Sequence, residues 1–586
     1  MLGAFLLLVP LAACERGSPD DPATASPGAA LPADGIKGPH AIFDYFEYRG
    51  NDPVFEAFRP DEGEYQNPIL AGFYPDPSIV QVGADYYLVN SSFCYFPGLP
   101  LFHSRDLVNW TQIGNVIDRP DQLDFDGLGL SRGIFAPSIS HRDGTFYLVT
   151  TCVDCGGNFV VTAKNPAGPW SDPVWLPEVD GIDPSLFFDD NGEAWIINNE
   201  EPVGGSTYDG HRALWIQRFD PETLSTFGSR TMIVNGGANL AEKPIWIEGP
   251  HIFRRNGQLY LISAEGGTSV QHSQVVFKAD RVTGPWVPYP NNPILTQRHL
   301  DPDRPYPVTS AGHADFVQTP SGQWWTTFLA TRPYRGNLYN TGRETFLMRV
   351  HWRDDWPVIT REDELIPYVA PRPDLPAQSA SAIPLTGNFT VRDEFDGPLP
   401  HYWMTMRVPG ESWYDLKHTP GAVTIRARPA SIGGFVQPSY LGRRQQHAHA
   451  TVTAAMRYDL RNPGDRAGLI ALQNDEYYYF FGVQRLEADI QLVLASRAGS
   501  AEPIDGRIIK AQSLRVTPGS PLELRIKARE SEYDFEYRLP ESDWRVFAGK
   551  QDGTLLSTEV AQGFVGVTLG MYAYTPEAGV NGGMSP

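Results

Sequence analysis

A pattern of one extended apolar segment, a glycine turn and one aromatic-rich segment recurs five times between residues 76 and 329. The copies start at Asp76, Ala136, Asp183, Glu248 and Gly312, and their turn glycines are Gly83, Gly144, Gly192, Gly257 and Gly322. Each copy is typical of a β-hairpin. Successive copies are separated by about 50 to 65 residues, which matches a four-stranded propeller blade. The pattern therefore predicts a five-bladed β-propeller.

A second hydrophobic pattern begins near residue 391, after a stretch without apolar periodicity. That stretch, residues 370–388, is rich in Pro, Ala and Ser and is typical of a linker. Beyond it, apolar segments alternate with turn signals, as in a β-sandwich. A chain of 586 residues also exceeds what one hydrophobic core usually organises. We therefore predict an all-β protein with a propeller over residues 62–370, a linker over 371–390 and a β-sandwich over 391–586.

The first 14 residues, MLGAFLLLVPLAAC, form an apolar stretch that is too short to span a membrane but suits a signal peptide. Its last four residues resemble a bacterial lipobox, in which Cys14 would be lipidated. Residues 15–61 are expected to form a flexible tether and a lead-in to the propeller. These features predict export, as a periplasmic or outer-membrane-anchored lipoprotein or otherwise as a secreted protein, with membrane attachment only through a lipid on Cys14.

Composition and charge limit the partners. The chain is 41% hydrophobic and 20% charged, as in globular proteins, and its formal net charge of -22 repels phosphate backbones. Nucleic acid is therefore excluded as a partner, whereas a neutral carbohydrate is compatible. Among only four cysteines, Cys152 and Cys155 form a lone CxxC pair without the second pair of a zinc site or the βαβ context of a redox motif. We expect a packed or disulfide-linked pair.

Polar residues recur where the repeats begin. Asp183, Glu248 and His313 each lie nine positions before their turn glycine, and Asp76 lies seven before its own. The first strand of each propeller blade lines the central channel, so these positions converge at one end of the axis. The alternative for the two aspartates is a turn role, because Asp-Pro commonly opens turns. Glutamate is a poor turn former, so this alternative is weaker for Glu248.

Three converging carboxyl groups suit the hydrolysis of a glycoside. This reaction needs one group that protonates the leaving oxygen and one carboxylate that activates water or attacks carbon. A third carboxylate raises the pKa of the acid by like-charge repulsion. A passive binding site would rarely accept this repulsion.

The motifs NPILAGFYPDPSI, GIFAPSI, GIDPSLFFDDNG, EGPHIFRRNG and TGRETF resemble, in this order, glycoside hydrolase family 43, chiefly its β-xylosidases and α-L-arabinofuranosidases. The resemblance covers about residues 62 to 580 and implies a five-bladed propeller that hydrolyses with inversion. It implies that Asp76 is the general base, Glu248 the general acid, and Asp183 the residue that modulates the pKa and orients the acid. It also implies that the sandwich is concanavalin-like (a jelly roll), with a loop that can reach over the active site.

The resemblance further implies roles for five other residues. His313 would contact a structural Ca²⁺ or its waters at the propeller centre, while the chemistry itself would require no cofactor. Arg343 would bind substrate hydroxyls, Phe93 would wall the sugar subsite and Thr268 would make a polar contact near it. Phe135 stands where relatives often carry Trp. The alternatives are an ion pair on the surface or between blades for Arg343, and ordinary blade core for the aromatics.

One departure from the family affects the expected substrate. The β-xylosidases carry a Trp shortly after the middle Asp, whereas this chain has Asn199, Glu200 and Glu201 there. We expect removal of xylose from the non-reducing end of xylo-oligosaccharides, with an α-L-arabinofuranosidase acting on arabinoxylan, or a dual enzyme, as the alternative. Two other readings are a non-catalytic sugar-binding propeller and a retaining five-bladed enzyme acting on fructosides.

Overall fold

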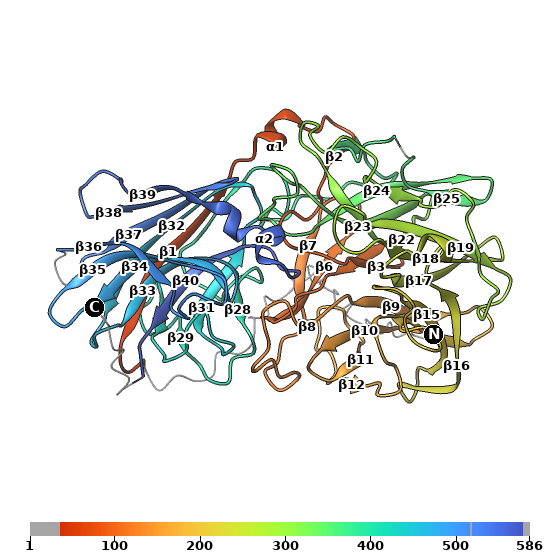
Figure 1. Cartoon of the computed structure of the whole chain (residues 1–586), viewed down its shortest axis with the longest axis horizontal. Coiled ribbons are helices and arrows are strands. Elements are labelled where there is room, and N and C mark those ends of the chain that lie inside the picture. Colours follow the sequence, from red (N-terminus) through yellow and green to blue (C-terminus); the bar gives the residue numbers. More distant parts are fainter. Residues whose placement is uncertain (1–35, 362, 516–518, 578–586) are drawn as a thin grey trace, which may run out of the picture.

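The computed structural model describes residues 36–361, 363–515 and 519–577. Within these residues two β-domains lie side by side, a propeller on the right of Figure 1 and a β-sandwich on the left. The predicted signal peptide, Cys14 and most of the predicted tether lie outside the described residues. The helices are short: α1 (Pro53–Ala57), α2 (Thr558–Ala561), and the 3-10 turns η1 (Leu240–Glu242) and η2 (Gly553–Leu556). None of the described helices is long and apolar enough to cross a membrane.

Five antiparallel sheets form the propeller blades, and the strand of each blade nearest the axis comes first in sequence. Blade one contains β3 (Ser78–Val82), β4 (Asp85–Val89), β6 (Gly98–Ser104) and β7 (Thr111–Ile117). Blade two contains β9 (Ser138–Arg142), β10 (Thr145–Val153), β11 (Gly157–Ala163) and β12 (Val174–Trp175), with β8 (Gly133–Ile134) paired to β10. Blade three contains β13 (Ile182–Phe188), β14 (Ala194–Glu200), β15 (Ala213–Asp220) and β16 (Ser225–Asn235).

The fourth and fifth blades complete the circle. Blade four contains β17 (Glu248–Arg255), β18 (Gln258–Glu265), β19 (Ser273–Ala279) and β20 (Val287–Pro288), with β21 (Leu295–Thr296) paired to β19. Blade five contains β22 (Thr309–Gln318), β23 (Trp324–Thr331), β24 (Glu344–Arg353) and β25 (Trp356–Val358). The two ends of the propeller segment meet where β2 (Glu64–Gln66) pairs with β26 (Val369–Pro371). The five-bladed propeller predicted from the repeats is therefore confirmed.

A buried carboxylate links the last blade to the first. Asp315 on β22 accepts hydrogen bonds through Oδ2 from the Ser78 hydroxyl at 2.8 Å and from the Ile79 amide at 2.9 Å, both on β3. The Ser78 hydroxyl in turn accepts from the Ile139 amide of blade two at 3.1 Å. Because a buried polar group must find partners, these bonds fix the blades relative to one another around the axis.

The sandwich consists of two sheets around one apolar core. The first sheet has the order β29 (Tyr414–Asp415), β30 (Val423–Arg426), β1 (His40–Gly50), β32 (His449–Asp459), β37 (Leu522–Arg529), β38 (Glu532–Arg538) and β39 (Arg545–Asp552), with β27 (Thr390–Asp393) paired to β1. The second has the order β36 (Arg507–Ser513), β35 (Ile490–Ala498), β34 (Tyr477–Arg485), β33 (Arg466–Asn474), β40 (Thr568–Tyr574), β31 (Ser439–Arg444), β28 (Met404–Met406) and β5 (Tyr95–Phe96).

Strand β1, ahead of the propeller in the sequence, belongs to the sandwich, which corrects the tether and lead-in expected over residues 15–61 for its described part, from residue 36 on. Strand β1 pairs with β32 from His40 to Gly50, and it is visible as a red strand among blue ones in Figure 1. Its side chains Phe43, Phe46 and Tyr48 are buried in the sandwich core. The local sequence did not indicate this placement, because the partner strand lies about 400 residues further along the chain.

The two domains share a continuous apolar core. One cluster contains Phe96 and Leu101 of the propeller segment together with Met404, Ile470 and Tyr478 of the sandwich. Strand β5 extends the second sandwich sheet by pairing with β28. The residues between β26 and β27, predicted as a linker, form no strand or helix in the structure. They pack against the propeller, where the Ala71 amide donates to the Leu385 carbonyl at 2.8 Å. The domains are therefore held as one body.

A buried ion-pair network joins the same two domains. Arg332 donates to Glu344 through Nε at 2.6 Å and to Asp52 through Nη1 at 3.0 Å, and each of these side chains is less than a tenth exposed. Asp52 also accepts from the His449 amide of the sandwich at 2.7 Å. Burial between opposite charges holds the pKa of Arg332 above its usual range despite desolvation.

We expect Asp52→Ala to lower the free energy of unfolding by about 3 to 5 kcal/mol, because it leaves a buried arginine with an uncompensated charge. Urea denaturation followed by fluorescence measures the change. Asp44→Ala on strand β1 is the control, since Asp44 pairs with Arg457 at a site where both side chains are about a third exposed. Its loss should cost below about 1 kcal/mol. Equal losses for both variants would contradict the assigned role of Asp52.

Candidate active site

One cavity of about 780 Å³ opens at the end of the propeller axis. All eight residues predicted from the sequence contribute to its wall: Asp76, Asp183, Glu248, His313, Arg343, Phe93, Phe135 and Thr268. They come from all five blades or from the loops between them. The structure therefore brings together the complete set, which is the geometric condition on which the predicted chemistry depends. The individual roles of these residues stay predictions.

The backbone adopts a rare conformation at three of the residues that line the cavity. Asp76, Asp183 and His313 have left-handed backbones, with φ of 52°, 54° and 52°. Non-glycine residues rarely adopt this conformation, and it costs on the order of 1 to 3 kcal/mol at each position. In β13 and β22 the strand register also shifts at this point. A bulge re-aims a side chain, so the irregularity turns these residues toward the axis instead of the blade.

Blade four carries a glycine at this place, directly after Glu248. A Cβ atom on Gly249 would lie 2.6 Å from Nε2 of His313, so only glycine allows the imidazole to pack there. The Gly249 amide donates to Oδ2 of Asp183 at 3.2 Å. Asp183 thereby holds the backbone next to Glu248, which fits the orienting role that the family resemblance implies.

Asp76 is held by an arginine, a histidine and a serine hydroxyl. Its Oδ1 is 2.9 Å from Nη1 of Arg343 and 3.6 Å from Nδ1 of His313, and its Oδ2 accepts a short hydrogen bond from the Ser91 hydroxyl. Asp76 and Arg343 are both only 5% exposed, so their attraction is weakly screened by water. This pair lies in the cavity wall, which excludes the surface ion pair considered for Arg343.

Glu248 and Asp183 lie in the opposite electrostatic environment. Burial raises the pKa of Glu248 well above its ordinary value, and the charges of Asp183 and Asp76 raise it further. Burial and the charge of Asp76 likewise raise the pKa of Asp183. Among the described residues, neither Glu248 nor Asp183 accepts a hydrogen bond from a cation, as Asp76 does from Arg343. The charges of Arg343 and Arg212 lower the pKa of Glu248, but burial and the two aspartates raise it more. The cavity thus holds one carboxyl group paired with an arginine, Asp76, and two whose pKa is raised, Asp183 and Glu248.

Three phenylalanines wall the cavity, and one of them comes from the sandwich domain. Phe564 stacks on Phe93 with ring centroids 5.9 Å apart, and it meets Phe135 edge-on at 5.4 Å. The guanidinium of Arg343 lies 5.5 Å from the Phe564 ring centroid. A loop of the sandwich therefore reaches the active site, as the family resemblance implied.

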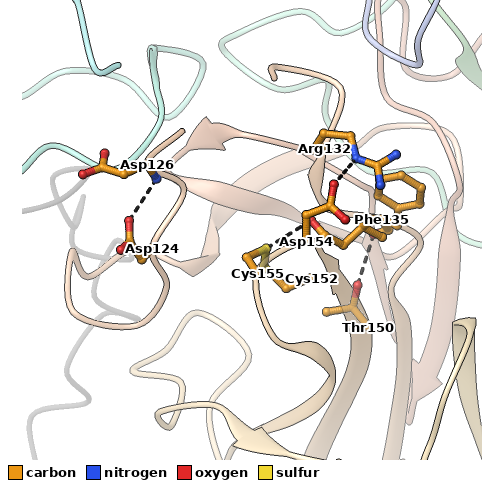
Figure 2. The surroundings of a disulfide bond; sticks show 9 residues. Asp124, Asp126, Arg132, Phe135, Thr150, Cys152, Asp154 and Cys155 are labelled. Atoms are coloured by element: carbon orange, nitrogen blue, oxygen red, sulfur yellow. Dashed lines mark hydrogen bonds and ion pairs between the residues drawn. A yellow bond between two sulfur atoms is a disulfide. The ribbon is translucent and has the colours of Figure 1, made fainter. Parts of the chain in front are cut away.

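The rim of the cavity on blade two is formed around a disulfide. Cys152 and Cys155 are disulfide-bonded, which decides between the two expectations for this pair. Figure 2 shows that Asp154, within this turn, points to Arg132 over the Phe135 ring; Arg132 Nε lies 2.6 Å from its Oδ2. The disulfide turn therefore positions Arg132 at the cavity.

The fit of a calcium ion near His313 depends on the ligands that the protein offers. Among the described residues, no group of three or more His, Cys, Asp or Glu side chains is arranged to hold a metal ion. Burial lowers the pKa of His313 to about 4, so its imidazole is neutral near neutral pH. The described side chains alone do not form a calcium site, and we derive no step through a metal.

Several lining residues were not found from the sequence. Trp246, Arg212 and Arg132 line the cavity together with Phe564. No sequence signal placed these residues there, since their positions depend on how the loops fold. Trp246 lies two positions before Glu248 but outside β17, in a left-handed conformation. Asn199, Glu200 and Glu201, noted as a departure from the family, also line the cavity.

The propeller buries carboxyl groups with different electrostatic environments at its axis. This arrangement is typical of glycoside hydrolases that work by acid–base catalysis. The family model for glycosyl hydrolases family 43 matches residues 65–357, and that of the beta xylosidase C-terminal concanavalin A-like domain matches residues 392–583. The chain belongs to glycoside hydrolase family 43, and its second domain is the concanavalin-like sandwich.

Relatives and solved structures agree with this assignment. A xylosidase/arabinosidase from Butyrivibrio fibrisolvens is 36% identical over 86% of this chain and 95% of its own length. A non-reducing end α-L-arabinofuranosidase from Bacteroides ovatus is 34% identical over 87% of this chain and 91% of its own. A GH43_12 structure from a capybara gut metagenome has a TM-score of 0.86 and 39% identity, covering 92% of this chain and all of that one. A xylan β-1,4-xylosidase from Bacillus halodurans has a TM-score of 0.78 and 31% identity, covering 87% and 96%.

The raised pKa of Glu248 predicts a pH-dependent stability. An unfolded Glu loses its proton near pH 4.3, whereas the folded one keeps it to higher pH. Between these two pKa values the unfolded state binds fewer protons, so stability falls as the pH rises. We expect Glu248→Gln to raise the thermal midpoint Tm more at pH 8 than at pH 5, measured by calorimetry. The exposed pair residue Glu364, changed to Gln, is the control. A gain in Tm that is the same at both pH values would disprove the buried-acid assignment.

Proposed function

We propose that this family 43 enzyme is an inverting exo-glycosidase that removes xylose from the non-reducing end of xylo-oligosaccharides. The observation that carries the proposal is the contrast within one cavity between Asp76, paired with Arg343, and Glu248, buried beside like charges. Hydrolysis by inversion needs this combination of an ionised base and a protonated acid.

In the proposed mechanism Glu248 donates its proton to the glycosidic oxygen, and Asp76 removes a proton from the water that attacks the anomeric carbon. Asp183 acts through Glu248, whose backbone it holds through Gly249 and whose pKa its charge raises. Arg343 pairs with the base and offers its remaining N–H groups to sugar hydroxyls. The phenylalanine walls exclude water from the apolar face of the sugar, which strengthens these polar contacts.

A second activity, α-L-arabinofuranosidase, is favoured by two observations. Asn199 and Glu200 stand at the cavity wall where the family's β-xylosidases carry a tryptophan, and the relatives include an arabinofuranosidase and a xylosidase/arabinosidase. Arabinofuranose and xylopyranose are both pentoses, so their sizes are similar.

Comparison of 4-nitrophenyl β-D-xylopyranoside with 4-nitrophenyl α-L-arabinofuranoside on the purified enzyme tests the specificity. We expect hydrolysis of both, with the higher kcat/KM for the xyloside. A preference for the arabinofuranoside would reverse the order of the two activities, and turnover of neither would reject the proposed substrate class.

The acid and base roles are tested by Asp76→Asn and Glu248→Gln. Each should lower kcat by about 10²- to 10⁴-fold, the usual worth of a positioned acid or base, with little change in sugar binding. Asp190→Asn, an exposed carboxylate on blade three, is the matched control. In addition, NMR of the first turnovers on a β-xyloside should show α-xylose. A first product of retained configuration, or full activity of either variant, would refute the assignment.

Export is also part of the proposal. Support comes from the apolar N-terminal segment, from the lipobox-like LAAC and from the Cys152–Cys155 disulfide, a bond typical of oxidising compartments. A lipid on Cys14 would anchor the enzyme to a membrane, and without it the enzyme would be periplasmic or secreted. Structural calcium near His313 stays a prediction.

A further inference from the structure

The cavity continues beyond the carboxyl groups along a wall that none of the predicted roles uses. A volume of about 780 Å³ is in the range that holds a drug-sized ligand, which is larger than one pentose. The largest side chain of this wall is Trp246, which is half-buried. The extra space therefore has room for a second sugar residue beside this tryptophan.

Trp246 is directed to the same side as the predicted acid. Ile247, between the two, is fully buried in the core of blades three and four, whereas Trp246 and Glu248 both line the cavity. The Trp246 and Glu248 side chains thus reach the same cavity from either side of a buried residue. The group that leaves with the proton of Glu248 is consequently released toward Trp246.

The conformation of Trp246 is unusual for a bulky residue and is held by surrounding loops. Its φ is 51°, in the left-handed region. The Trp246 amide donates to the Gly210 carbonyl at 2.8 Å, and the Gly266 amide donates to the Ile245 carbonyl at 2.8 Å. A Cβ atom on Gly210 would lie 2.8 Å from Cβ of Ile245, so glycine is required for this approach. Strain of this kind persists where surrounding contacts fix a functional side chain.

Arg212 supports the ring. Its guanidinium lies 4.2 Å from the Trp246 ring centroid, at the distance of a cation–π contact. Nη1 of Arg212 also donates to the His211 carbonyl at 2.8 Å and to the Ser206 hydroxyl at 3.2 Å, so the guanidinium is fixed. The positive charge of Arg212 lowers the pKa of Glu248, although burial and the two aspartates raise it more. Arg212 is therefore close to the predicted acid.

We propose that Trp246, backed by Arg212, binds the leaving sugar, so that the substrate class is an oligosaccharide with a pyranose on the far side of the cleaved bond. One face of a pyranose is lined by C–H groups and packs well on a flat indole, while the guanidinium donates to its hydroxyls. This inference rests on the proposed function, because it requires Glu248 to be the acid. Trp246 thereby selects the leaving group, while other residues of the cavity recognise the pentose.

The test compares two substrates that share the pentose and differ in the leaving group. Xylobiose leaves a pyranose that reaches Trp246, whereas β-xylosyl fluoride leaves a single atom that does not. We expect Trp246→Ala to lower kcat/KM on xylobiose by about 10- to 100-fold, mainly through KM, and to change it less than 2-fold on the fluoride. Trp246→Phe should restore most of the loss on xylobiose, because it keeps a flat ring.

Control variants separate this role from a structural one. Trp544→Ala removes a half-buried tryptophan that stacks on Arg525 at 3.6 Å in the sandwich, and it should affect neither substrate. If Trp246→Ala does not fold, Trp246→Leu keeps apolar bulk without the ring and should show the same selective loss. Equal losses on both substrates, or none on xylobiose, would overturn the proposal for Trp246. An inactive wild-type enzyme on both substrates would instead refute the proposed function.

Discussion

The repulsion among three buried carboxyl groups is the constraint on which the rest of this structure depends. Asp76, Asp183 and Glu248 lie close enough for each charge to influence the next, in a place where water screens little. Arg343 stabilises only one of them directly. An arrangement of this kind destabilises the fold, so the scaffold around it must be rigid. Pairing with Arg343 distinguishes Asp76 from the two carboxyl groups whose pKa is raised.

Rigidity comes from connections that run across domain boundaries. Asp315 joins the last blade to the first, and the Asp52–Arg332–Glu344 network joins blade five to the sandwich. The apolar core between the domains is continuous, so the loop that carries Phe564 is fixed relative to the propeller axis. The sandwich is therefore part of the active site, because it supplies one of the three aromatic walls.

The sequence predicted those features that depend on local pattern. The repeated hairpins defined the five blades, and the common position of Asp183, Glu248 and His313 before the turn glycines predicted their convergence. The sequence did not predict features that depend on pairing between distant segments of the chain. Strand β1 looks like any amphipathic strand, and only its pairing with β32 shows where it belongs. Phe564 likewise reaches the cavity through the packing of a whole domain. Trp246 likewise reaches the cavity through the fold of its loop, because it precedes β17 and has a left-handed backbone.

The position of β1 has a consequence for the modularity of the chain. This strand lies between β30 and β32, inside the first sheet of the sandwich, although it is encoded ahead of the propeller. The ribosome therefore completes the propeller segment before the sandwich can acquire all its strands, and the N-terminal strand waits for most of synthesis without its neighbours. A truncation that begins at residue 62 or at residue 391 would remove the middle of a sheet, so the two domains cannot be separated by a single cut in the gene.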